Sequence, residues 1–138
     1  MNYNLQGFAT GAGHFLVAFG LACLFIALFK RIYQMTTPYD ERALIAAGNT
    51  AAAITLSGAI LGFALPVASA LEQTGSIVEF ALWAVLAGVI QIIAFLVMRR
   101  FIIADARGQI ESGNTATAVY FAATSIAVGL LNAASMTY

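Results

Sequence analysis

The chain has 138 residues, of which 62% are apolar and 9% are charged, and its formal net charge at neutral pH is zero. With a mean hydropathy of +0.90 it has too little polar surface to coat a soluble domain of this size. The composition therefore excludes an ordinary soluble protein and indicates one that has lipid as its solvent.

Four apolar stretches follow one another along the chain, at about residues 7–29, 51–71, 77–98 and 116–136. Each is about as long as the ~20 residues that a helix needs to cross ~30 Å of hydrocarbon. The stretches are continuously apolar, contain no Lys or Arg, and lack the alternation typical of barrel strands. The sequence predicts an all-α membrane protein with four transmembrane helices.

The first stretch is expected to be a retained span rather than a signal peptide. Residues 1–14 carry no Lys or Arg, and the run is long for the apolar region of a signal peptide and ends at Phe29-Lys30-Arg31.

The basic residues predict the orientation, because all of them fall between the first and second stretches or between the third and fourth. They are Lys30, Arg31, Arg42, Arg99, Arg100 and Arg107. The turn between the second and third stretches carries only Glu72 and Glu79. By the positive-inside rule, both basic connections are expected in the cytoplasm, and both termini and the acidic turn on the outer side of the membrane.

A fifteen-residue pattern occurs twice, starting at Asp40 and again at Asp105. Eight of the fifteen positions are identical, and each copy contains Asp-x-Arg followed by Gly-Asn-Thr-Ala just before an apolar stretch. The pattern predicts a structural unit used twice. Because each unit crosses the membrane twice, we expect a single membrane domain over 1–138 with two tandem, parallel hairpins at about 1–71 and 77–138.

The first connection has a typical helix start, with Thr37 as the N-cap and Pro38 at the first helical position. The second span is therefore expected to begin near Pro38 and to run as one helix to Pro66, where a kink is expected. Asp40, Arg42, Asp105 and Arg107 are assigned to the charged cytoplasmic connections.

The Gly-Asn-Thr-Ala elements are the best candidates for chemistry, at Asn49, Thr50, Asn114 and Thr115. These residues can cap a helix or join neighbouring helices, and this packing role is favoured. The alternative is that Asn49 and Asn114 meet near the axis between the repeats and line an entrance for an ion or small solute. Gln91 and Asn132, both inside spans, have the same two interpretations.

Four pairs of small residues are spaced by four positions, which places each pair on one helix face. They are Gly7 and Gly11, Gly58 and Gly62, Ala84 and Gly88, and Ser125 and Gly129. Such pairs permit close helix packing. His14, the only histidine, is expected to make a hydrogen bond inside the bundle rather than to relay protons.

Signatures of catalysis are absent from the sequence. One histidine and one cysteine, Cys23, leave no metal-ligand cluster and no nucleophile with a base. We expect a protein that is not an enzyme and that has no cofactor, no metal and no nucleic-acid partner.

Several segments together resemble the YjfL-type bacterial inner-membrane proteins, a family grouped as a domain of unknown function. They are the two Gly-Asn-Thr-Ala elements, residues 60–66, residues 83–91 and residues 125–134. The resemblance implies a four-span inner-membrane protein and supplies no catalytic residues. It also implies relatives encoded beside phage-shock-like membrane-remodelling proteins and glutathionylspermidine-synthase-like enzymes.

Two functions remain open, of which the first is preferred and the second is the alternative. The first is a homo-oligomer that forms a channel-like path for an ion or small solute, lined by Asn49, Asn114, Gln91 and Asn132. The second is a non-transporting anchor that recruits a cytoplasmic protein, one acting in membrane stress, through the charged connections. Membrane lipid is a partner in both.

Overall fold

The computed structural model describes residues 4–136, which form helices joined by turns and short bends. The elements in chain order are α1 (Leu5–Thr36), α2 (Glu41–Ala46), α3 (Thr50–Gln73), α4 (Ile77–Val97), the π-helical segment η1 (Met98–Ile102), α5 (Ala106–Glu111) and α6 (Thr115–Ala134). The all-helical fold class predicted from the sequence is confirmed.

Four helices are long and apolar enough to cross a membrane: α1, α3, α4 continued by η1, and α6. They cover the four apolar stretches of the sequence, with α1 longer than predicted at both ends. Their outward faces carry many exposed large apolar side chains, such as Phe15, Leu82 and Leu131. Such a surface fits lipid and not water.

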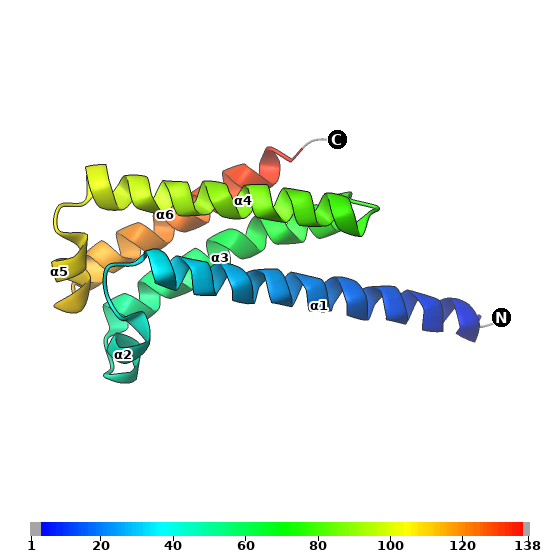
Figure 1. The fold of residues 1–138 in the computed structure, drawn as a ribbon, viewed down its shortest axis with the longest axis horizontal. Coiled ribbons are helices and arrows are strands. Elements are labelled where there is room, and N and C mark those ends of the chain that lie inside the picture. The colour runs from blue at the N-terminus through cyan, green and yellow to red at the C-terminus, as the bar shows by residue number, and fades with distance from the viewer. Residues whose placement is uncertain (1–3, 137–138) are drawn as a thin grey trace.

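The two short helices lie at the same end of the bundle, which we call the loop end (Figure 1). Here α2 joins α1 to α3, and α5 joins η1 to α6. The turn between α3 and α4 lies at the opposite end, toward which the first residues of α1 and the last residues of α6 also point (Figure 1).

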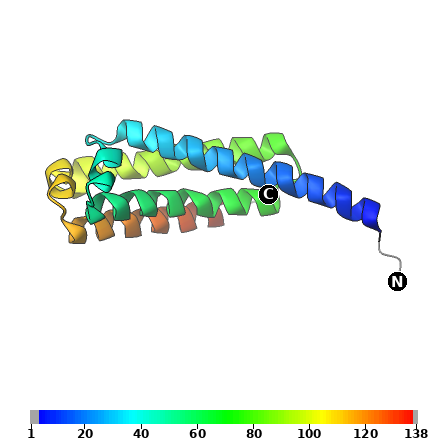
Figure 2. The same ribbon diagram turned by 90° about the horizontal axis from the view of Figure 1, so that it is seen from below.

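Helix α3 is the most buried of the four long helices and packs most closely against α6. The two lie side by side in both views (Figures 1 and 2). A Cβ added at Gly129 would lie 2.0 Å from the Gly62 carbonyl oxygen, and one added at Gly58 would lie 2.3 Å from the Ala122 Cα. Only glycine permits this approach, so three of the small residues singled out in the sequence hold α3 against α6.

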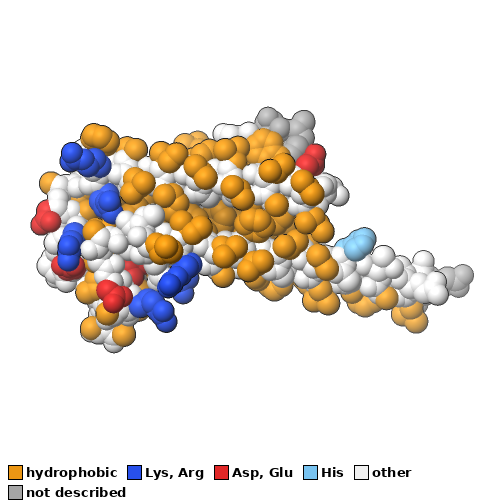
Figure 3. Space-filling model, viewed as in Figure 1, with side chains coloured by type: hydrophobic (Ala, Val, Ile, Leu, Met, Phe, Trp, Pro, Cys, Tyr) orange, Lys and Arg blue, Asp and Glu red, His pale blue; other side chains and the backbone are white. Residues whose placement is uncertain are grey.

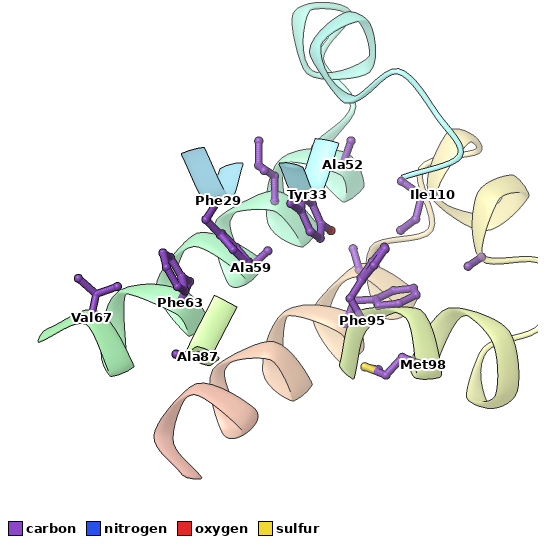
Figure 4. Packing of buried hydrophobic residues seen from close by; sticks show 14 of the residues in the cluster. Phe29, Tyr33, Ala52, Ala59, Phe63, Val67, Ala87, Phe95, Met98 and Ile110 are labelled. Carbon is purple, nitrogen blue, oxygen red and sulfur yellow. The ribbon is translucent and has the colours of Figure 1, made fainter. Parts of the chain in front are cut away.

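An aromatic cluster fills the bundle between its middle and the loop end (Figure 4). Phe29 of α1 stacks on Phe63 of α3 with ring centroids 4.3 Å apart, and Tyr33 meets Phe95 of α4 at 4.8 Å. Phe95 in turn lies 5.5 Å from Phe121 of α6. The cluster therefore joins all four long helices.

The first half of α1 extends beyond the bundle (Figures 1 and 2). With 32 residues, α1 is about 48 Å long, longer than the ~30 Å of hydrocarbon that it must cross. A Cβ added at Gly11, Gly13 or Gly20 would meet nothing within 4 Å. The pair Gly7 and Gly11 therefore lies outside the helix contacts of this chain.

The predicted helix start at Thr37 and Pro38 is wrong. Thr37 is the C-cap of α1, and the next helix begins at Glu41 with Asp40 as its N-cap. The second span does not continue from this helix, because the chain turns at Gly48 and Asn49 before α3 starts. Asp is a strong N-cap residue, and Asp40 rather than Thr37 caps the helix that follows.

The helix α3 runs through Pro66 to Gln73. Of the two predicted hairpins, residues 1–3 and 137–138 lie outside the described part of the chain.

Candidate functional site

Each copy of the fifteen-residue pattern begins with an aspartate that caps a short helix. The Asp40 carboxylate accepts a hydrogen bond from the Ala43 backbone N–H at 3.1 Å, and that of Asp105 accepts one from Gly108 at 3.3 Å. Asp105 adopts a left-handed backbone conformation with φ of 50°, whereas Asp40 does not. Both aspartates, assigned from the sequence to charged connections, therefore also hold α2 and α5 in place.

The Gly-Asn part of the pattern turns the chain into the next long helix. Gly48 and Gly113 have φ of 87° and 82°, a region that favours glycine. Asn49 and Asn114 then cap α3 and α6 by accepting from the Ala52 and Thr117 N–H groups at 3.0 and 3.2 Å. Thr50 and Thr115 are the exposed first residues of these helices.

The amide groups of the two asparagines have different partners. Asn49 Nδ2 donates across the molecule to the Ile110 carbonyl oxygen at 2.9 Å, at the end of α5. Asn114 Nδ2 donates to the Gln109 side chain at 3.1 Å, within its own connection. Asn49 thus ties the two connections together, and no hydrogen bond among the described residues joins Asn49 to Asn114.

The two buried amides inside the spans connect helix α6 to helix α4. Gln91 Nε2 donates to the Ser125 carbonyl oxygen at 3.2 Å, and Asn132 Nδ2 donates to the Ala87 carbonyl oxygen at 3.1 Å. The Gln91 Oε1 atom is buried and makes no hydrogen bond within residues 4–136. Both side chains therefore lie in helix contacts of this chain.

His14 is exposed on α1, unlike the bundle-facing position expected from the sequence. It lines a groove of about 510 Å³ together with Leu71, Thr74, Ser76 and Phe80 at the α3–α4 turn. The difference arises because the first half of α1 leaves the bundle (Figure 1).

All six basic residues gather toward the loop end (Figure 3). Arg99 Nη1 donates to the Thr36 carbonyl oxygen at 2.7 Å and so satisfies the end of α1. Arg107 pairs with Glu111 at 3.0 Å on the surface. Lys30, Arg31, Arg42 and Arg100 are exposed. The loop end therefore presents a charged surface directly beside the apolar faces of the long helices.

Sequence reasoning missed the most unusual side chain of this end, Glu41. It is the first residue of α2, is only 2% exposed, and neither carboxylate oxygen accepts a hydrogen bond from the described residues. Burial raises the pKa of the Glu41 carboxyl to about 7, although Gln34 and the Lys30 ammonium act in the opposite direction. Burial and the Glu41 carboxylate likewise raise the pKa of Tyr39.

One signal in the sequence could have found Glu41. The corresponding residue in the second copy of the pattern is Ala106, which is also buried. An acid in the first turn of a helix interacts favourably with the helix N-terminus without being buried, whereas the comparison with Ala106 points to an inward position.

Comparisons with known proteins agree with this architecture. A family model described as Domain of Unknown Function (DUF350) matches residues 5–136. The inner membrane protein YjfL of Escherichia coli K12 is 37% identical over 119 residues, which cover 86% of this chain and 88% of that protein. The transmembrane protein YshE of Bacillus subtilis is 29% identical over 112 residues, covering 81% and 83%. No solved structure matches the chain.

Proposed function

The chain belongs to the DUF350 family of multi-pass membrane proteins, and we propose that it is a non-transporting anchor that presents its loop end to a cytoplasmic protein. The observation that carries this proposal is that the basic residues gather toward the loop end (Figure 3), on α2 and α5, the second half of α1 and η1. The shared name of the relatives, an inner or transmembrane protein, assigns no reaction.

The hydrogen bonds of the amide side chains support an anchor over a path through a single chain. Gln91, Asn132 and Asn49 each donate to a backbone carbonyl oxygen of another element. A side chain engaged in this way contributes to helix association and has fewer free groups for a passing solute.

The proposal includes an orientation and an origin. The loop end lies in the cytoplasm and both termini lie in the periplasm, because the basic side chains are retained inside. The residues 1–71 and 77–138 are two tandem, parallel hairpins of one membrane domain. The repeated order of Asp cap, left-handed glycine and Asn cap supports this origin. The protein is not an enzyme.

The anchor is tested by placing a photo-crosslinking amino acid at Arg42 or Arg107, both exposed on the short helices. We expect a specific cytoplasmic adduct from both positions. Neutralising the other arginine to Gln should weaken the adduct, because the proposed docking is charge-dependent. The control carries the crosslinker at Leu82, which is exposed on the apolar face of α4. Equal adducts from Leu82, or none from either arginine, would contradict the proposal.

A second candidate function is permeation between copies in a homo-oligomer. The observation that favours it is the first half of α1, where Gly11, Gly13 and Gly20 are open to a neighbouring helix. In that assembly a channel-like path for an ion or small solute would run between chains, and the helix contacts within each chain would stay as they are.

Flux measurements distinguish the two functions. Protein reconstituted in liposomes is assayed with common cations, anions and polyamines against empty vesicles and against a Gly20→Leu variant, which fills the open face of α1. Flux that the variant abolishes supports permeation between copies. The absence of flux above empty vesicles removes this candidate and leaves the anchor unaffected.

A further inference from the structure

The elbow between α1 and α2 encloses three titratable side chains. Tyr33 in the last turns of α1 is 1% exposed, Tyr39 in the bend is 7% exposed, and Glu41 at the start of α2 is 2% exposed. Tyr33 and Glu41 stand at the two ends of a nine-residue segment. The bend in this segment brings the side chains of Tyr33, Tyr39 and Glu41 close enough to interact. They are among the few polar groups that the described chain buries.

The oxygen atoms of this cluster form no full hydrogen bond in the described part of the chain. Tyr33 Oη, Tyr39 Oη and both carboxylate oxygens of Glu41 are buried and form no hydrogen bond within residues 4–136. A carboxylate removed from water without a donor is costly as an anion, and adding one proton removes most of that cost. The site therefore favours the neutral acid more than an exposed glutamate does.

The charged groups around Glu41 moderate this preference. Lys30 of α1 attracts the ionised carboxylate, and Arg99 of η1 acts on Tyr39. Gln34 and Tyr33 of α1 also favour the ionised form, because their side chains approach the carboxylate as hydrogen-bond donors. Helix α3 adds nothing to this balance, because its one titratable side chain, Glu72, lies at the opposite end. Burial and attraction oppose each other, so both protonation states are accessible near neutral pH.

A metal cation fits the cluster poorly. Hard cations take six or more oxygen ligands, and no group of three or more His, Cys, Asp or Glu side chains lies together among residues 4–136. The positive charges of Lys30 and Arg99 also repel a cation at this point. A proton needs only one carboxylate oxygen.

The second connection has apolar residues at the positions that correspond to this polar cluster. In the second hairpin, Met98, Ala104 and Ala106 stand at the positions of Tyr33, Tyr39 and Glu41, and Met98 and Ala106 are buried. The second connection, whose backbone passes through η1 and the left-handed Asp105, therefore buries apolar side chains at two of these positions. Glu41 therefore gives the first connection a buried titratable group, which the second connection, with Ala106 at this position, lacks.

We propose that Glu41, enclosed by Tyr33 and Tyr39, is a proton-binding site that changes the charge inside the α1–α2 elbow as the surrounding pH changes. The proton binds to and leaves one carboxylate oxygen, and no other bond changes. The site is independent of the anchor and permeation functions, since it depends only on contacts within one chain.

The experiment is an infrared titration of the purified full-length protein in liposomes, following the carbonyl stretch of protonated carboxylic acids. We expect a band that is absent from the Glu41→Gln variant and that disappears with a midpoint near pH 7. The control is Glu72→Gln, an exposed acid at the other end of the molecule, which should leave the band in place. A Glu41 band with a midpoint near 4.5, the value for an ordinary glutamate, would overturn the proposal.

A second pair of variants keeps the test valid if Glu41→Gln folds poorly. Lys30→Gln should raise the midpoint by up to about one pH unit, because it removes a positive charge that acts on Glu41. Arg31→Gln, the adjacent exposed cation, should move it less. Equal shifts would overturn the assignment of the band to the elbow. A midpoint that depends on exchanging sodium for potassium at constant ionic strength would show a metal-ion site instead.

Discussion

Ionisation of the buried Glu41 side chain destabilises the folded protein. The carboxylate is buried and forms no full hydrogen bond within residues 4–136, so ionisation costs more free energy in the folded protein than in the unfolded chain, where water solvates the group. The folded state therefore binds the proton more tightly than the unfolded state does, and the stability of the protein depends on pH.

The first prediction concerns this pH dependence. The pKa of Glu41 is raised from 4.5 to about 7, so the free energy of unfolding should fall as pH rises between these values and stay constant above them. The loss is at most about 3 kcal/mol. Glu41→Gln should remove this slope and be more stable than the wild type at pH 8, as measured by unfolding in detergent micelles. Glu72→Gln should keep the slope.

The asparagines give a second prediction at the same scale. Serine retains the capping oxygen but lacks the amide donor, so Asn49→Ser should lose the hydrogen bond to Ile110 and keep the cap of α3. We expect Asn49→Ser to lower the free energy of unfolding by about 1 kcal/mol more than the matched Asn114→Ser. Chemical unfolding of both variants measures the difference, and equal losses would show that Asn49 does not tie the connections together.

For single residues, the sequence predicted which side chains cap helices better than it predicted which other elements those side chains contact. The Gly-Asn element was correctly singled out, because glycine followed by a capping residue has local meaning at a helix start. Asn49 donates to α5 and Asn114 donates to Gln109. This difference depends on which element packs next to each amide in the folded chain. The burial of Glu41 depends in the same way on how α1 and α2 fold together.

Among the elements, the contact between α3 and α6 depends on glycine. Without side chains at Gly58, Gly62 and Gly129, the two backbones approach closely enough for carbonyl oxygen atoms to occupy the space of a Cβ. Lipid gives helices no hydrophobic drive to associate, so such close packing and the amide hydrogen bonds from Gln91 and Asn132 stabilise the bundle.

This contact leads to the third prediction. Gly129→Ala should force α3 and α6 apart and lower the free energy of unfolding by about 1–3 kcal/mol, because the added methyl group meets the Gly62 carbonyl. The matched variant Gly20→Ala, on an open face of α1, should leave stability unchanged or raise it by up to about 1 kcal/mol. Thermal unfolding of both proteins in the same detergent makes the comparison. A loss of the same size for Gly20→Ala would argue against the α3–α6 contact as the cause.

Element positions were largely predictable, and the connections were not. Continuous apolar stretches of span length define α1, α3, α4 and α6. The predicted start at Thr37 and Pro38 was wrong because several residues near it, Asp40 included, have capping propensity, and sequence alone does not rank them. The chain uses Asp40, since the end of α1 already occupies Thr37.

At the scale of the whole molecule, charge is distributed along one axis. The basic side chains gather toward the loop end, and the acidic α3–α4 turn lies at the opposite end (Figure 3). Both connections lie together at one end, so a single orientation places every basic residue on the same side of the membrane.

The fourth prediction tests this orientation with single cysteines in a protein whose Cys23 is replaced by Ser. A cysteine at Ala47 or Ser112, both exposed at the loop end, should be protected from a membrane-impermeant maleimide in intact spheroplasts. A cysteine at Gly75, in the exposed α3–α4 turn, should react. Permeabilised cells serve as the control in which all three react. Reaction of Ala47→Cys with protection of Ser112→Cys would contradict the shared side of the connections.

The sequence by itself determined the class of protein, the number and location of its long helices and the end at which its positive charge gathers. These properties follow from composition, run length and charge order, which are local quantities that any membrane protein must satisfy. The tertiary structure alone decided the close approach of α3 and α6, the departure of α1 from the bundle and the burial of Glu41. Each of these depends on which surfaces meet in three dimensions, and residues far apart in the chain determine that together.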